Sequence, residues 1–575
     1  MTAVPTTAAL LPGAARATSR WRWIGFAALV GLNQGAVTLT LALASSIVGV
    51  QHAGFESGLL FGSYTVSALL AAVPTVRMLG AKRTACVALL VQGAYVTAYF
   101  AASVVPTVAL PVCIAGSVIG GIASGMLWTA QGTYFAQFAR SRALPSPTGS
   151  TSDETAILAS YFASTFLCVE VAVKLIGFVA LRMPEPMVSN ATGNASFHVD
   201  QTGAEAAQSS SSSSSWVQQL TLAGLAIVTA ACGLLAALVV PDLGAPTPPA
   251  GSEPCVEASA ALELPGQTGW RDRFGRLGAA LSVAAEPHAL LLAPFNVTFA
   301  SSSALLTNYV DAAIARPLLG ISSVSIFAAL LSAVAALGSF ASARLSTRVG
   351  KPAVLCGACA CFFALAAYLA GVEVLCIVED REPPTRAIGD GDHASPSEGG
   401  RCTTTHGAYF GWPQLATVYA LQGLGRGAWE STNRAVWADA FPSCADAAFA
   451  MLLLQFGLAS TVAYALFPLL PPIASMGACA ILALLAAAGA ARSGCMQATE
   501  RRMREDAAAL GAGTAPPTRL PLSEDGRSTG SSGSDGEAAG PLTVADGAPA
   551  STSDSDAVLL HVRSQSAKLN RALSL

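Results

Sequence analysis

Charged side chains recur at helical spacing inside otherwise apolar stretches of the sequence. Arg426, Glu430 and Arg434 are four residues apart, and Glu170 and Lys174 are four apart in another stretch. Residues four apart share one face of a helix, so each set places opposite charges side by side. A charge at the centre of a membrane costs about 2.5–3.5 kcal/mol on insertion scales. Such groups therefore serve either as structural ion pairs or as a relay for protons or ions.

Two interpretations of the charged group that contains Glu430 remain open. In the first, Glu430 bridges Arg426 and Arg434 and acts as a structural clamp. In the second, Glu430 and Asn433, together with Gln131 from an earlier apolar stretch, line a central site whose charge pairs rearrange during function.

Further polar residues lie in the first, fourth, seventh and tenth apolar stretches. We expect them to line a cavity near the middle of the membrane. This candidate set comprises Asn33, Gln34, Gln131, Asn308, Asp311, Glu430, Asn433 and Arg434. A polar lining is typical of a cavity for a small solute, although a cavity inherited from a transporter and no longer used would have the same lining.

No pattern in the sequence indicates covalent catalysis or a cofactor. There is no P-loop, HExxH or GxSxG motif. Cys356 and Cys359 have the CxxC spacing, but they lie in an apolar stretch, and all six histidines fall outside such stretches. We therefore expect neither an enzyme nor a metal site.

The composition defines the class of protein. The 575 residues are 53% hydrophobic and only 11% charged, whereas soluble proteins carry roughly 25% charged residues. The net charge of -3 offers no field for binding nucleic acid. The chain is therefore expected to be a helical protein that crosses a lipid bilayer many times.

The apolar stretches have the length that this class requires, which is about 20 residues for each crossing. Twelve candidates are divided six and six by a polar gap: 24–50, 59–76, 85–105, 108–128, 156–181, 217–240, 289–313, 321–343, 353–378, 413–436, 447–470 and 472–491. The predicted fold is all-α, with about twelve transmembrane helices in two six-helix halves. The predicted organisation is a cytoplasmic segment (1–22), a first bundle (23–240), a cytoplasmic loop (241–286), a second bundle (287–492) and a disordered tail (493–575).

Basic residues near the stretch ends predict the orientation. They concentrate before the first stretch and in every second loop, which places both termini in the cytoplasm. Two acceptor sequons, at Asn190 and Asn194, fall in a loop on the opposite side and are predicted glycosylation sites. Cys376 and Cys402 flank another outside loop, where a disulfide and two free thiols both remain open.

The two halves are related by an internal repeat. Gly121 and Gly125 of the fourth stretch align with Gly423 and Gly427 of the tenth, and residues 129–131 then align with 431–433. A basic, glycine-containing turn follows both the second stretch (77–83) and the eighth (348–351). Such matching positions indicate a duplicated six-helix unit.

With these features the sequence resembles the major facilitator superfamily and, within it, the Unc-ninety-three-like family. The resemblance lies in LWTAQGTY at 127–134, in GRGAWESTNRAVWAD at 425–439, and in Asn33-Gln34 followed by LASSI at 43–47. It covers roughly residues 20–492. The sequence departs from the wider superfamily at the turn motif, because Arg77 and Thr347 occupy the positions that usually hold an acid. The charge lock that this acid forms elsewhere is therefore not expected here.

Two functions are compatible with these features, and they belong to different classes. The resemblance implies a regulatory or trafficking subunit for a membrane channel or receptor, since some family members regulate ion channels or escort receptors. This is the interpretation that the sequence favours. The alternative is a secondary transporter that moves a small solute by alternating access. The expected partners are thus the lipid bilayer and either a channel or receptor subunit or a small solute, in the plasma membrane or an endomembrane.

Overall fold

The computed structural model describes residues 12–48, 50–143, 151–182, 216–241, 282–381, 409–442 and 444–512. Residues 1–506 belong to one compact unit, and of residues 507–575 the structure describes only the end of the last helix. The described part of the chain is built from helices and contains no strand.

The first half consists of six transmembrane helices, one of them assembled from three consecutive segments. They are α1 (Pro12–Ile47), α2 (Val50–Ser67) with η2 (Ala68–Ala72) and α3 (Val73–Leu79), α4 (Ala81–Val104), α5 (Ala109–Ala143), α6 (Thr151–Arg182) and α8 (Trp216–Val239). A short turn, η3 (Pro106–Val108), joins α4 to α5.

The second half repeats this plan. It comprises α11 (Pro287–Leu305) with η4 (Leu306–Ala315) and α12 (Arg316–Leu319), α13 (Ile321–Val349), α14 (Lys351–Arg381), α16 (Trp412–Ala428) with η5 (Trp429–Asn433) and α17 (Arg434–Ala440), α18 (Ala445–Leu466) with η6 (Phe467–Leu469), and α19 (Pro472–Ala512). The last helix therefore continues well beyond the predicted boundary at residue 492.

Eleven of these helices in the described part of the chain are long and apolar enough to cross a membrane. The twelfth crossing is the continuous helix of α16, η5 and α17, whose segments have 17, five and seven residues. It contains Arg426, Glu430 and Arg434 and is therefore less apolar than the others. The predicted all-α membrane fold with two six-helix halves is confirmed.

Glycine ends the second and eighth helices in the same way. Gly80 follows α3 with φ 83°, and Gly350 follows α13 with φ 88°. Only glycine adopts this backbone conformation without strain, so both turns require it. We call the end of the bundle that contains these two turns the inner end, and the end at Val105 and Gly320 the outer end.

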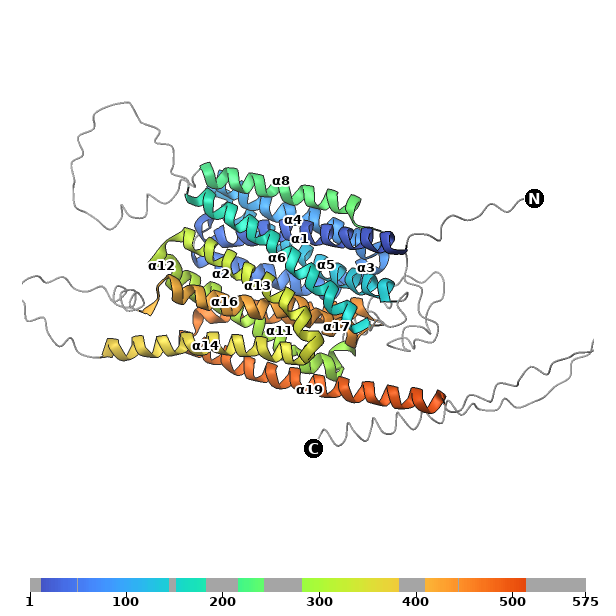
Figure 1. Cartoon of the computed structure of the whole chain (residues 1–575). Helices are drawn as coiled ribbons and strands as arrows, with labels where there is room; N and C mark the ends of the chain where they lie inside the picture. The colour runs from blue at the N-terminus through green and yellow to red at the C-terminus, as the bar shows by residue number, and fades with distance from the viewer. Residues whose placement is uncertain are drawn as a thin grey trace, which may run out of the picture. The chain divides into compact units, whose positions relative to one another are not determined.

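Helices of the two halves pack against each other along two lines. In one, α6 packs along α13, and in the other, α2 packs along α18. Figure 1 shows α8 at the edge of the first half beside α4 and α1, away from α11 and α16. The helices that line the interface between the halves are therefore those able to enclose a central site.

The aligned glycines mark corresponding close contacts in the two halves. A Cβ atom at Gly121 or Gly125 of α5 would lie 2.3 Å from the Leu60 carbonyl oxygen or 2.6 Å from that of Tyr64, both on α2. In the second half, a Cβ atom at Gly427 of α16 would lie 2.6 Å from the Ala335 carbonyl oxygen of α13. Small residues allow helix backbones to approach this closely in a membrane.

We expect Gly427→Ala to destabilise the second half by about 1–3 kcal/mol, because the new methyl group would collide with backbone atoms rather than with a flexible side chain. Gly357→Ala is the matched control, since no heavy atom lies within 4 Å of a Cβ built there. The measurement is the melting temperature of the purified chain. Equal melting temperatures for the two variants would contradict the packing argument.

Candidate functional site

A central cavity of about 1050 Å³ lies between the two halves. Its lining comes from α1, α2, α5 and α6 of the first half and from α11, η4, α13, α16, η5 and α18 of the second. It extends to Gly54, Arg316 and Pro468 at the outer end, and Thr307 on its wall is exposed. The cavity is therefore accessible from the outer end and has the size of a site for a small solute.

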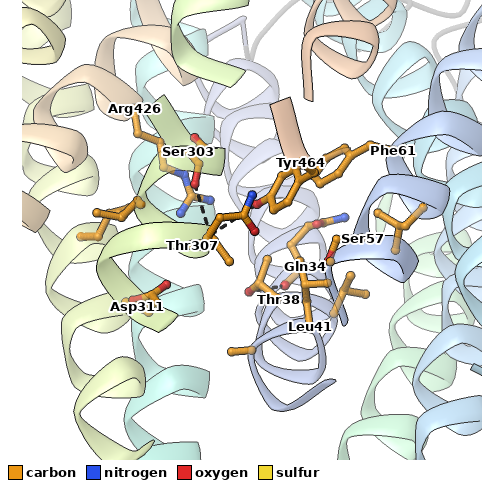
Figure 2. Close-up of a pocket in the computed structure, with 18 of the residues that line it drawn as sticks. Gln34, Thr38, Leu41, Ser57, Phe61, Ser303, Thr307, Asp311, Arg426 and Tyr464 are labelled. Carbon is orange, nitrogen blue, oxygen red and sulfur yellow. Dashed lines mark hydrogen bonds between the residues drawn. The ribbon is translucent and has the colours of Figure 1, made fainter. Parts of the chain in front are cut away.

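Figure 2 shows how the two halves face each other across this cavity. Ser303, Asp311 and Arg426 of the second half lie on one side, and Gln34 and Thr38 of the first half lie on the other. Polar side chains from both halves can therefore contact one solute at the same time.

A buried charge network connects the halves at residues in the interior of α6 and α16. The Arg426 guanidinium of α16 donates two hydrogen bonds to Glu170 of α6, with N–O distances of 2.7 and 3.1 Å. Lys174 Nζ lies 2.5 Å from Glu170 Oε1 and 3.0 Å from the hydroxyl of Ser332 on α13. Glu170 is fully buried and accepts hydrogen bonds from both cations. This pairing offsets the large cost of removing the charges from water.

Glu430 does not bridge two arginines, so the structure differs from the expected clamp. Its carboxylate forms an ion pair with Arg434 at 2.8 Å, while Arg426 turns towards Glu170 in the other half. The carboxylate of Glu170 accepts two hydrogen bonds from the Arg426 guanidinium, a bidentate geometry that binds an arginine strongly.

Arg434 contributes a second contact between the halves, just below the cavity. Its guanidinium donates to Gln131 Oε1 of α5 at 2.5 Å and lies 4.5 Å from the ring centre of Trp128. Trp128 itself lines the cavity. Arg434, Trp128 and Gln131 together close the cavity towards the inner end.

A third polar group lies on the wall nearer the outer end. Asp311 accepts a hydrogen bond from the Tyr419 hydroxyl, and Gln422 Nε2 donates to the Ser303 hydroxyl at 3.1 Å. Asp311 belongs to η4, a ten-residue π-helical segment. Such π-helical segments often occur at functional sites, and here two of them, η4 and η5, contribute to the cavity.

Aromatic rings form another part of the wall. The rings of Phe299 and Trp429 stack with centres 4.5 Å apart, and Phe456 lies 5.5 Å from Phe299. Phe61 and Tyr464 stack across the halves at 5.3 Å. The cavity therefore combines a polar side with an apolar, aromatic side.

The structure separates the eight expected cavity residues into two groups of four. The residues on the wall are Gln34, Asn308, Asp311 and Glu430. The residues buried behind it, contrary to expectation, are Asn33, Gln131, Asn433 and Arg434. They hold helices together: Asn33 donates to the Leu89 carbonyl oxygen at 3.0 Å, and Asn433 donates to Asn296 Oδ1 at 2.9 Å.

Other expected residues can be placed only in part. Glu170, Lys174 and Arg426 form the buried charge network between the halves. Asn190, Asn194 and Cys402 lie outside the described residues, so the glycosylation sites and the disulfide with Cys376 remain predictions. Among the described residues, no group of three His, Cys, Asp or Glu side chains is arranged to hold a metal ion.

The inner end of the bundle is closed. Phe135 of α5 packs against Phe449 of α18 with ring centres 6.3 Å apart, and Trp23 stacks on Phe138 at 5.2 Å. These residues belong to one apolar core that spans both halves.

Ion pairs reinforce this closure at the same end. Arg77 Nε, at the end of the second helix, lies 2.6 Å from Asp446 at the start of α18. Asp439 pairs with Lys351 at 2.5 Å and accepts a hydrogen bond from Thr155 of the first half at 2.8 Å. Arg77 occupies the position that usually holds an acid. It still forms an ion pair between the halves, but here the first half supplies the base and Asp446 of the second half supplies the acid. No signal in the sequence pointed to this pair, because Asp446 is far away in the chain.

Comparison with solved structures identifies the architecture. A variant of the fucose:proton symporter FucP of E. coli matches over 82% of this chain and 97% of its own, with 11% identity and a TM-score of 0.50. FucP in the outward conformation, a major facilitator superfamily transporter, matches over 83% and 99%, with 12% identity and a TM-score of 0.52. The chain has the major facilitator fold. At this identity, the likeness establishes the fold alone.

No protein-family model matches the chain, and no curated protein matches it. The resemblance to the Unc-ninety-three-like family therefore remains a prediction.

We expect Glu170→Gln to be far more damaging than Lys174→Met. Loss of the carboxylate leaves two buried cations without their acid, at a cost of about 3–5 kcal/mol, whereas loss of Lys174 leaves Glu170 paired with Arg426. The matched control is Glu56→Gln, since Glu56 is a buried acid that accepts a hydrogen bond from Tyr99 rather than from a cation. The readout is the yield of monodisperse protein and its melting temperature. Equal losses for Glu170→Gln and Glu56→Gln would contradict the role of the network.

Proposed function

We propose that the protein is a secondary transporter that moves a small solute across the membrane by alternating access. The observation that carries this proposal is a solute-sized cavity lined by both halves, accessible at the outer end and closed at the inner end. A cavity that is open at one end only is what one state of an alternating-access cycle requires. The similarity to FucP, whose structure is of an outward conformation, supports it.

The contacts between the halves are weaker at the inner end than at the buried Glu170 network, as this cycle requires. Arg77–Asp446, the ion pair that joins the halves at the inner end, is partly exposed, with 42% of the Arg77 side chain and 15% of the Asp446 side chain accessible. Such a pair contributes little net stability, about 0–1 kcal/mol. The halves can therefore separate at the inner end while the buried Glu170 network remains paired.

The regulatory function that the sequence favoured has less support. It rests on the family resemblance alone. Co-purification of a channel or receptor subunit in fixed stoichiometry would support the regulatory function.

The proposal is tested by measuring accessibility at both ends of the pathway. Asp446→Asn with Thr155→Ala removes the two polar contacts that join the halves at the inner end, so the population open at the inner end should rise about tenfold, since 1.4 kcal/mol changes an equilibrium tenfold. A cysteine introduced at buried Ala136 of α5 should then react faster with a maleimide reagent. A cysteine at exposed Ala312, on the cavity wall, should react more slowly.

The parent chain without the new cysteines corrects for native thiols, and Asp506→Asn, an exposed acid on α19, is the matched control. Opposite changes at the two positions support alternating access. Parallel increases at both positions would indicate general loosening of the fold, and unchanged rates would indicate a static cavity; either result contradicts the proposal.

A further inference from the structure

A buried acid of the first half lies outside both the central cavity and the charge network. Glu56, in the first turns of α2 towards the outer end, is 1% exposed and does not line the cavity. Its Oε2 accepts a hydrogen bond from the Tyr99 hydroxyl of α4 at 2.7 Å, whereas its Oε1 has no hydrogen-bond partner among the described residues. Buried charges in proteins are paired with an opposite charge or bind a metal ion. One neutral donor therefore leaves this carboxylate incompletely satisfied.

No lysine or arginine in the described part of the chain forms an ion pair with this carboxylate. The titratable groups that interact with it are His52, one turn earlier on α2, Tyr95 and Tyr99 of α4, and Cys113 of α5. His52 is exposed to solvent and makes no ion pair with the acid. The position that a partner cation would occupy is thus not filled by a side chain of the described residues.

Two further oxygens beside this acid also lack partners. Tyr95 is fully buried, and its ring centre lies 5.0 Å from that of Tyr99; Ser117 of α5 is 1% exposed. Both hydroxyls lie near that of Tyr99, but neither has a partner at hydrogen-bond geometry among the described residues. Buried polar atoms without partners are rare in folded proteins. Three of them around one hydroxyl point to a ligand that would satisfy them.

The chemistry of these atoms defines the class of the ligand. Carboxylate and hydroxyl oxygens are the ligands that hard cations prefer. A hydroxyl oxygen has two lone pairs, so it can bind a cation and still donate its proton to a neighbouring carboxylate. With a single carboxylate, a monovalent cation makes the site neutral, whereas a divalent cation would leave a net charge buried within the membrane.

We propose that a cluster of four oxygen-bearing side chains binds one monovalent metal cation, for which Na⁺ is the probe. The members of this oxygen cluster are Glu56, Tyr95, Tyr99 and Ser117, from α2, α4 and α5. The residues directly before and after Glu56, Phe55 and Ser57, line the central cavity. The bound ion therefore holds in place the part of α2 that forms the outer wall of the cavity. This inference goes beyond the proposed transport function and does not depend on it.

The test is equilibrium binding of radioactive Na⁺ to the full purified chain at about pH 8, where few protons compete for a carboxylate. N-methylglucamine chloride keeps the ionic strength constant. Binding should saturate at one ion per chain. The melting temperature should rise with the Na⁺ concentration by about 1–3 °C, because the ion binds only the folded chain. A rise that N-methylglucamine chloride alone reproduces would be a general salt effect and would overturn the inference.

Two variants test the proposed ligands separately. Glu56→Gln should lower the affinity for Na⁺ at least about tenfold, because it removes the negative charge of the oxygen cluster. Tyr95→Phe removes one oxygen and keeps the ring, so it should lower the affinity about tenfold while leaving the melting temperature without Na⁺ unchanged. Tyr95→Phe tests the site even where Glu56→Gln reduces the folded yield.

Cys113→Ala is the matched control, since Cys113 is buried beside the same acid but its sulfur is a soft ligand that does not suit Na⁺. This variant should bind Na⁺ as the parent chain does. No saturable binding by the parent chain, parental affinity in Glu56→Gln or Tyr95→Phe, or equal losses in Tyr95→Phe and Cys113→Ala would each overturn the inference. The accessibility test uses neither Na⁺ nor these variants, so the two proposals can fail separately.

Discussion

The contact between Arg426 of α16 and Glu170 of α6 is the interaction on which the rest of the arrangement depends. On its own helix, the acid four residues from Arg426 is Glu430, and that carboxylate forms its ion pair with Arg434. In the other half, Glu170 already holds Lys174. A transmembrane helix with three charges is stable only where these charges find partners in the bundle. Each half therefore supplies a charge that the other half requires, and this network determines where the two halves come into contact.

This constraint explains how one interface can be stable and mobile. The network is buried between α6, α13 and α16, and separating its charges would be costly. At the inner end the halves are joined by the more exposed Arg77–Asp446 pair and by the hydrogen bond from Thr155 to Asp439. A rocking motion that keeps the Glu170 network paired and breaks the contacts at the inner end therefore has the lower free-energy cost. The close glycine contacts within each half, at Gly125 and Gly427, favour movement of each half as a rigid body.

The sequence predicted the fold well because its signals are local. Apolar length, basic loops and the turn glycines Gly80 and Gly350 are each visible within a short window. The site was predicted less well, because cavity lining depends on helix rotation. The four-residue spacing of Arg426 and Glu430 could not show that Arg426 pairs with Glu170 in the other half. Gln422 and the aromatic wall were missed, since a glutamine or a phenylalanine in an apolar helix carries no signal of its own. Arg77–Asp446 joins residues 369 positions apart and needed the three-dimensional fold.

The most direct test of alternating access is a pair of distance distributions measured by pulsed electron paramagnetic resonance on the full chain. Bio-orthogonal spin labels at the exposed residues Met78 and Leu345 report on the inner end of the two halves, and labels at Leu110 and Trp412 report on the outer end. Alternating access predicts two populations at each end that change in opposite directions when Asp446 is replaced by Asn. A single distance at both ends that this substitution leaves unchanged would contradict it.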